Sequence, residues 1–236
     1  MPVRYAWSLA FYLTTSMAAA SQTTSPTIIT REEWGATAPA FAFNPMPPIY
    51  RATIHNTAGQ APTQLAFAKS QMRAIQIFHR DVRGWADIGY HFVIDRAGRI
   101  YEGRPLGAVG AHAGPGIENN LGNIGIALMG NYMKYPPTAK QMESVQRLAL
   151  WLSTAYKIEP EQWKGHIDYN PHKGCPGYFI TKQLPKLRAW LSEKLLVLRA
   201  EKETVELRKE TAMERLLRLR KADSSADKPL LTIPWP

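Results

Sequence analysis

The chain has 236 residues, 45% of them hydrophobic and 10% aromatic, and carries a formal net charge of +10. This length suffices for one domain with a substantial core plus additional segments, and the composition is that of a folded soluble protein. The charge favours an anionic partner such as a cell-wall polymer, a membrane surface or a nucleic acid, and the single cysteine excludes an internal disulfide.

Residues 1–20 are typical of an export signal. They begin with the basic stretch "MPVR", continue with an apolar run and end in three alanines. We therefore expect cleavage near Ser21, a linker over 21–28 and a secreted or periplasmic protein. Serines and threonines interrupt the apolar run, which argues against a transmembrane segment, and no cysteine near the cleavage point offers a lipoprotein anchor. A plain N-terminal extension is the alternative.

The next 160 or so residues alternate between strand and helix patterns. Apolar and β-branched runs predict strands, and apolar residues three and four apart predict helices, one of them with Thr138 as N-cap. The expected strands lie at 52–58, 88–95, 100–104 and 123–130, and the expected helices at 63–81 and 138–156. This order predicts an α/β fold: a single domain over 29–190 with a central mixed β-sheet flanked by helices.

Residues 191–236 are expected to form a charged helical extension with a disordered C-terminus. Four apolar residues recur at intervals of seven: Leu198, Val205, Ala212 and Leu219. Lys202 and Lys209 fall beside them and break a clean heptad seam, so a solvated helix with charge pairs is favoured over a weak coiled coil or a basic arm that faces the cell wall. We accordingly expect a monomer.

Three residues could together hold a metal ion. His55 follows a strand pattern in "TIHNTAG", while His166 and Cys175 share the Gly- and Pro-rich stretch "GHIDYNPHKGCPG". Two imidazoles and one thiolate form a suitable zinc set with one open position. Because 111 positions separate His55 from His166, spacing alone favours a buried structural cysteine with surface histidines.

Six segments taken in order alter that balance. They are "REEWGA" at 31–36, "TIHNTAG" at 53–59, the long run containing "DIGYHFVID" at 75–105, "GAHA" at 110–113, "NNLGNIGIALMGNY" at 119–132 and "GHIDYNPHKGCPG" at 165–177. The chain thereby resembles the zinc-dependent N-acetylmuramoyl-L-alanine amidases of the type 2 family, which includes the peptidoglycan recognition proteins and phage-type amidases. The resemblance covers roughly residues 30–190.

The resemblance implies a role for each matching position. It implies Zn²⁺ as the cofactor, peptidoglycan or its muropeptides as the partner, and hydrolysis of the amide between N-acetylmuramic acid and L-alanine. The implied ligands are His55, His166 and Cys175, the implied catalytic residues are Tyr90 and Lys173, and the implied substrate-binding residues are His112 and Asn120. Ala127 stands where some relatives carry a glutamate, which favours a mechanism that depends on Tyr90.

The remaining candidates are expected to have structural roles. His79 lies on the apolar face of a predicted helix, and His91 alternates with Tyr90 and so points to the other face of its strand. His172 flanks the cysteine loop and is a candidate for lining the cleft, although nothing requires it. Asp168 is expected to hold that loop or a proton near the ligands.

The sequence also departs from the family pattern. Pro105 and Leu106 replace a Gly-Trp pair that many recognition-type relatives carry, which leaves the stem-peptide preference open. Lys173 and the absence of further cysteines favour the bacterial or phage-like branch. Two alternatives stand beside the amidase: a recognition protein that binds peptidoglycan without cleaving it, and, on charge alone, a nucleic-acid-binding protein, for which no motif argues.

Overall fold

The computed structural model describes residues 23–114, 116–171 and 174–224. It divides them into two compact units, one spanning 23–199 and the other holding 200–224. The expected signal peptide, Lys173, His172 and the expected disordered end at 225–236 lie outside the described residues. Among the helices described, none combines the length and apolar character needed to cross a membrane.

The first unit is built on one six-stranded sheet with the strand order β1-β4-β3-β5-β2-β6. Strands β3 and β4 run antiparallel, and the other neighbouring pairs run parallel. The sheet is therefore mixed, as the sequence predicts. The strands are β1 (Ile28–Ile29), β2 (Arg51–Asn56), β3 (Phe92–Ile94), β4 (Ile100–Glu102), β5 (Asn123–Leu128) and β6 (Trp163–Gly165).

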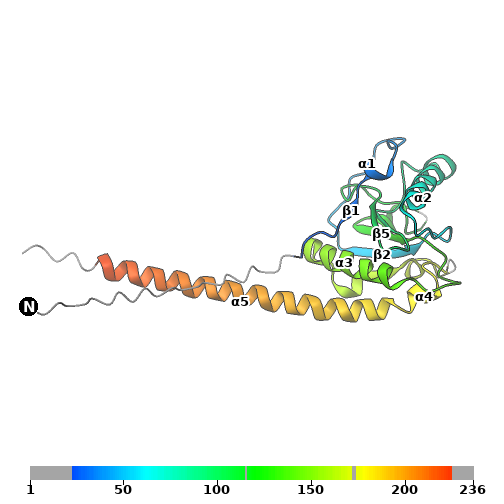
Figure 1. Ribbon diagram of the computed structural model, residues 1–236. Helices are drawn as coiled ribbons and strands as arrows, with labels where there is room; N and C mark the ends of the chain where they lie inside the picture. Colours follow the sequence, from blue (N-terminus) through cyan, green and yellow to red (C-terminus); the bar gives the residue numbers. More distant parts are fainter. Residues whose placement is uncertain (1–22, 115, 172–173, 225–236) are drawn as a thin grey trace, which may run out of the picture. The chain divides into compact units, whose positions relative to one another are not determined.

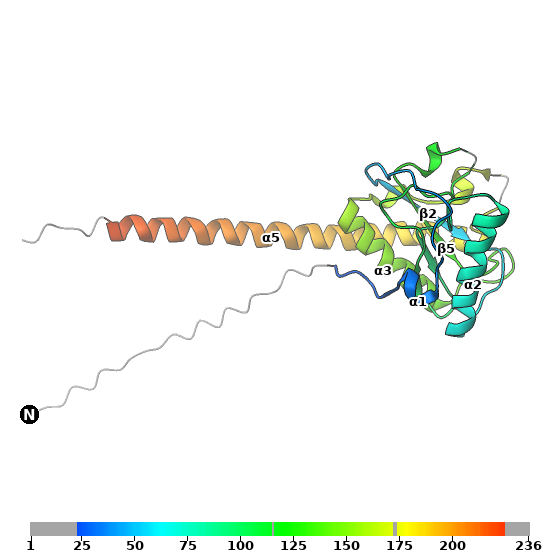
Figure 2. The same cartoon turned by 90° about the horizontal axis from the view of Figure 1, so that it is seen from above.

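Helices cover both faces of this sheet (Figures 1 and 2). One face packs against α1 and α2, and the other packs against α3 and the first part of α5. This layered arrangement confirms the predicted α/β class. The α-helices are α1 (Arg31–Trp34), α2 (Leu65–Ile77), α3 (Ala139–Tyr156), α4 (Tyr178–Thr181) and α5 (Leu184–Ser224), with a π-helical turn, η1 (Phe78–Val82), and 3-10 turns η2 (Glu118–Asn120), η3 (Pro160–Gln162) and η4 (His166–Asp168).

Helix α3 shows why these segments are helical. Its N-cap is the predicted Thr138, whose hydroxyl accepts the backbone N–H of Gln141 while the Gln141 side chain accepts the N–H of Thr138. This capping box satisfies two backbone donors that the first helical turn leaves open. Val145, Leu148 and Leu152 then recur on one face and are buried against the sheet.

Alternation along β2 separates the core from the functional side of the sheet. Ile54 is buried in the cluster that contains α3, whereas the next residue, His55, points to the face that α1 and α2 cover. His55 lies one residue before the C-terminal end of β2. A side chain at this place is held by the sheet and still reaches the sheet edge, where parallel sheets commonly bind ligands.

The expected strand at 88–95 is shorter in the structure, because β3 begins only at Phe92. The reason is a side chain that enters the ladder: Nδ1 of His91 accepts the N–H of Gly125 at 2.9 Å. That N–H is thereby unavailable to a backbone carbonyl of the neighbouring strand. Tyr90 therefore lies in an extended segment just before β3, and the predicted strand was too long at this end.

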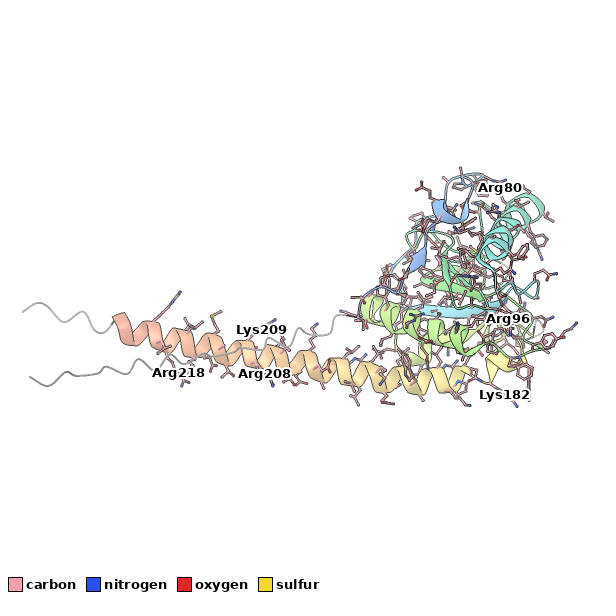
Figure 3. All side chains as sticks on the ribbon, in the orientation of Figure 1. Arg80, Arg96, Lys182, Arg208, Lys209 and Arg218 are labelled. Atoms are coloured by element: carbon pink, nitrogen blue, oxygen red, sulfur yellow. The ribbon has the colours of Figure 1, made fainter. Side chains whose placement is uncertain are left out.

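The C-terminal helix differs between the two units. Within the first unit, α5 buries four leucines three and four residues apart: Leu184, Leu187, Leu191 and Leu195. Within the second unit, the helix continues to Ser224, and of its side chains from 200 to 220 all are exposed except the partly buried Val205. Arg208, Lys209 and Arg218 project from this part (Figure 3). The predicted solvated helix agrees with this arrangement.

Candidate metal centre

Strand pairing brings the three predicted metal ligands together. β2 and β6 are parallel neighbours, with Ile54 opposite Gly165, so His55 and His166 emerge side by side although 111 positions separate them. His166 is the first residue of the turn η4, and Cys175 follows in the next loop. One donor atom from each of the three residues lies within 4.8 Å of the others.

The spacing of these atoms suits zinc. Sγ of Cys175 lies 3.8 Å from Nδ1 of His55, and tetrahedral zinc with Zn–S and Zn–N bonds of about 2.3 and 2.0 Å places two such ligands about 3.5 Å apart. The rings of His55 and His166 have centroids 4.6 Å apart. His55 and His166 are buried, while Cys175 is partly exposed, which leaves the centre accessible from the side of the cysteine.

Asn56 fastens the cysteine loop to the sheet. Its backbone N–H points to Sγ of Cys175 at 3.4 Å, and its side-chain amide donates to the carbonyl oxygen of Pro176 at 2.7 Å. A donor directed at sulfur favours the thiolate, which is the form that binds metal. In the sequence, Asn56 carries no signal of this role beyond its place directly after a candidate ligand.

The other side of His55 is occupied by His112. Nε2 of His55 and Nδ1 of His112 are 3.0 Å apart, and Nε2 of His112 lies 3.1 Å from the carbonyl oxygen of Asn123. The side-chain oxygen of Asn120 accepts the backbone N–H of His112 at 2.8 Å. His112 and Asn120 are both buried, and the contacts just described join them to other residues of the core. The substrate-binding role expected for these two residues stays a prediction.

Burial governs the electrostatics of this pair. Removal from water lowers the pKa of both His55 and His112 well below the usual range, and the neighbouring imidazoles lower it further. Both rings are consequently neutral at neutral pH. A neutral imidazole has one unprotonated nitrogen, which a metal ligand requires.

Tyr90 lies beside the three ligands. Its ring is tilted against that of His55 with centroids 5.3 Å apart, and it also contacts His79. Burial and the charge of the Cys175 thiolate raise the pKa of Tyr90 far above its usual value. The phenol is thus protonated at neutral pH and available as a hydrogen-bond donor. The other predicted catalytic residue, Lys173, lies outside the described residues.

His79 and His91 have internal partners, as their sequence positions predict. Nδ1 of His79 accepts the N–H of Gly89, and His91 accepts from Gly125 and donates to the carbonyl oxygen of Ala108. Asp168 accepts the N–H of Gly165 at 2.9 Å and approaches Arg188 at 3.7 Å. It thereby holds the turn that carries His166.

Comparison with known proteins identifies the family. The sequence profile described as N-acetylmuramoyl-L-alanine amidase matches residues 45–178, which include the three candidate ligands. The chain belongs to this amidase family. Strands β2 to β6 lie within the matched residues, and β1 precedes them.

Relatives of the amidase domain include recognition proteins and an amidase. Peptidoglycan recognition protein 1 of Bos taurus is 35% identical over 164 residues, which cover 68% of this chain and 85% of that protein. The N-acetylmuramoyl-L-alanine amidase of Homo sapiens is 35% identical over 127 residues, which cover 51% of this chain and 21% of that protein. Membership of the family therefore leaves catalysis and recognition to be decided at the site.

Solved structures show the same architecture. The Drosophila peptidoglycan recognition protein SD superposes with a TM-score of 0.61 at 33% identity, covering 66% of this chain and 93% of that one. A structure of peptidoglycan recognition protein LE, solved in complex with tracheal cytotoxin, a monomeric diaminopimelic-acid-type peptidoglycan, gives a TM-score of 0.60 at 30% identity and covers 66% and 92% of the two chains.

Proposed function

We propose that this protein is a zinc-dependent amidase that hydrolyses the bond between the lactyl group of N-acetylmuramic acid and the L-alanine of the stem peptide in peptidoglycan. The observation that carries the proposal is the convergence of His55, His166 and Cys175 within 4.8 Å. A protein that only binds peptidoglycan has no need of three metal-ligating side chains that face one point. Secretion or export to the periplasm, where the substrate lies, is part of the proposal.

The ligand chemistry supports zinc in particular. Imidazole and thiolate are donors that zinc prefers, and three of them form an open site. Zinc in such a site supplies a water of lowered pKa and polarises a carbonyl oxygen. The roles of this chain's own residues are then to hold His55 neutral by burial, to hold the Cys175 thiolate through Asn56, and to exclude bulk water from the sheet side.

Tyr90 has the properties of a donor to the reacting carbonyl. Its phenol is protonated at neutral pH because its pKa is raised, and its ring contacts that of His55. A protonated hydroxyl at this place stabilises negative charge that develops on the oxygen of the scissile amide. Ala127, opposite His55 in strand β5, carries no carboxylate that could act as a base. We also propose that Lys173, two positions before Cys175 in the sequence, stabilises the same developing negative charge.

The alternative function is recognition without cleavage. It is favoured by the number of recognition proteins among the relatives, such as recognition protein SD. The two functions differ in one measurable outcome, which is whether stem peptides are released from a muropeptide that the protein binds.

Cys175→Ser tests the amidase proposal directly. We expect stem-peptide release from purified sacculi to fall by more than about 100-fold, because a serine hydroxyl is a poor zinc ligand. Loss of a direct ligand should weaken zinc binding more than the roughly 10- to 100-fold typical for a residue that only orients a ligand. Lys209→Ala, on the exposed part of α5, is the matched control and should retain activity. Full activity of a folded Cys175→Ser protein would refute the proposal.

A further inference from the structure

His112 lies beneath the proposed zinc site rather than in it. It comes from a loop outside the regular elements, its side chain is buried, and one of its ring nitrogens contacts a candidate ligand while the other contacts the backbone. A carbonyl oxygen only accepts hydrogen bonds, so Nε2 of His112 must carry a proton to bond Asn123. This constraint determines which nitrogen carries the proton in the rings of His112 and His55.

A buried, neutral His112 with its proton on Nε2 has a lone pair on Nδ1. That lone pair faces Nε2 of His55 at 3.0 Å and therefore accepts a proton from it. His55 in turn must be protonated on Nε2, which leaves the lone pair of its Nδ1 directed at the side where Sγ of Cys175 lies 3.8 Å away. The chain of hydrogen bonds thus aims the metal-binding lone pair.

We propose that His112 is a positioning residue that locks His55 in the tautomer able to bind zinc, and so sets the zinc affinity of the site. The proposal rests on the zinc site proposed above. It gives His112 a role distinct from contact with substrate, because an inner ring that is 6% exposed acts through His55. Outer partners of this kind orient metal-bound imidazoles and raise their basicity.

Two glycines make room for the His112 ring. A Cβ at Gly125 would lie 2.4 Å from Cδ2 of His112, and a Cβ at Gly110 would lie 2.5 Å from the same atom. Any larger residue at either position would displace the ring. Asn120 in addition accepts the backbone N–H groups of His112 and Ala113. Ring and backbone are both held, as expected of a group whose orientation matters.

The first experiment measures zinc affinity by competition with a chromophoric chelator, for proteins shown to be folded by circular dichroism. We expect His112→Ala to bind zinc about 10- to 100-fold more weakly than wild type. His112→Asn should retain most of the affinity, because its amide oxygen occupies nearly the position of Nδ1 and accepts the same hydrogen bond.

The matched control is Ser144→Ala. Ser144 is a buried polar residue of α3, on the other face of the sheet from His55, and its hydroxyl donates to the carbonyl oxygen of Gly98. Its replacement should lower stability and leave zinc affinity within about twofold of wild type, which separates a general loss of core stability from the loss of the hydrogen bond to His55. Equal affinities of wild type, His112→Ala and His112→Asn would overturn the proposal.

A second measurement reads the tautomer without metal. Long-range ¹H–¹⁵N correlation spectra of the imidazoles in metal-free wild-type protein should show His55 protonated on Nε2, and a mixture of tautomers in His112→Ala. A wild-type His55 protonated on Nδ1 would overturn the proposal even if the variant failed to fold. Wild-type protein that binds no zinc would refute the proposed function instead, with the tautomer still deciding the role of His112.

Discussion

The two sides of the candidate metal centre are built differently. On the sheet side, His55 is 1% exposed, sits in a six-residue strand between two neighbours, and is backed by His112. On the loop side, Cys175 is partly exposed, and Asn56 fastens its loop to the sheet: the backbone N–H of Asn56 points at Sγ of Cys175, and its side-chain amide donates to the carbonyl oxygen of Pro176. The sheet therefore fixes the orientation of the ligands, while the loop leaves the centre accessible.

The sheet side should be the more sensitive to acid. Burial lowers the pKa of His91 to about 4, against about 6.5 when unfolded, so the unfolded chain binds a proton that the folded chain excludes. Stability should therefore fall as the pH drops from about 6.5 towards 4, by roughly 3 kcal/mol for this one group. Urea unfolding of metal-free protein at several pH values measures it.

His91→Gln is the control for the acid effect, since glutamine does not titrate. The difference in stability between wild type and this variant should shrink on acidification through that window. A difference that stays constant between pH 6.5 and 4 would show that His91 is not held neutral by the fold.

Gly125→Ala perturbs the sheet side of the centre without changing a ligand. The added methyl would lie 2.4 Å from the His112 ring, and overpacking of this kind costs about 1–3 kcal/mol. We expect lower stability and weaker zinc binding with His55, His166 and Cys175 unchanged. Gly107→Ala, where a Cβ meets nothing within 4 Å, is the matched control. Zinc affinity equal to wild type in Gly125→Ala would mean that the His112 ring can move freely.

Asn56→Ala perturbs the loop side of the centre. The variant loses the hydrogen bond from the side-chain amide of Asn56 to the carbonyl oxygen of Pro176, which is worth about 1 kcal/mol. It keeps the backbone N–H directed at Cys175. We expect stability to drop by that amount and zinc to dissociate faster, because the loop is less firmly held. Stopped-flow chelator exchange measures the rate, and an unchanged rate would contradict the importance of this contact.

Removal of residues 200–236 should have the smallest effect. The four buried leucines of α5 all precede this point, and the side chains described beyond it are exposed apart from Val205. We expect the free energy of unfolding of the amidase domain to change by less than about 0.5 kcal/mol, as measured by urea denaturation. A larger loss would show that the charged part of α5 contributes to the fold.

Local patterns in the sequence predict the regular elements well. Thr138 before an amphipathic run predicts the start of α3. The charge of the C-terminal segment predicts its exposed part, but not that Leu191 and Leu195, beyond the expected end of the domain at 190, are buried in the core. The shortening of the strand at 88–95 could not be foreseen, because it depends on a ring of His91 that reaches Gly125, 34 positions away. Long-range side-chain contacts leave no local periodicity.

The candidate site likewise combines residues that the sequence predicts with contacts that it does not. Residue types and family resemblance point to His55, His166 and Cys175, and the parallel pairing of β2 and β6 explains how distant positions meet. The contacts of His112 and Asn56 could not be predicted, because each depends on which of two nitrogens or which backbone group faces a neighbour. Such orientations follow from the folded packing, and the sequence carries no separate signal for them.

Cleavage of muropeptides at the lactyl amide separates an amidase from a recognition protein. Mass spectrometry of products from defined muropeptides, with zinc-loaded protein and with protein treated with chelator, detects it. The proposed function predicts free stem peptide that begins with L-alanine and the matching glycan from the zinc-loaded protein alone. Muropeptides that are bound but recovered intact would contradict it and establish a recognition protein.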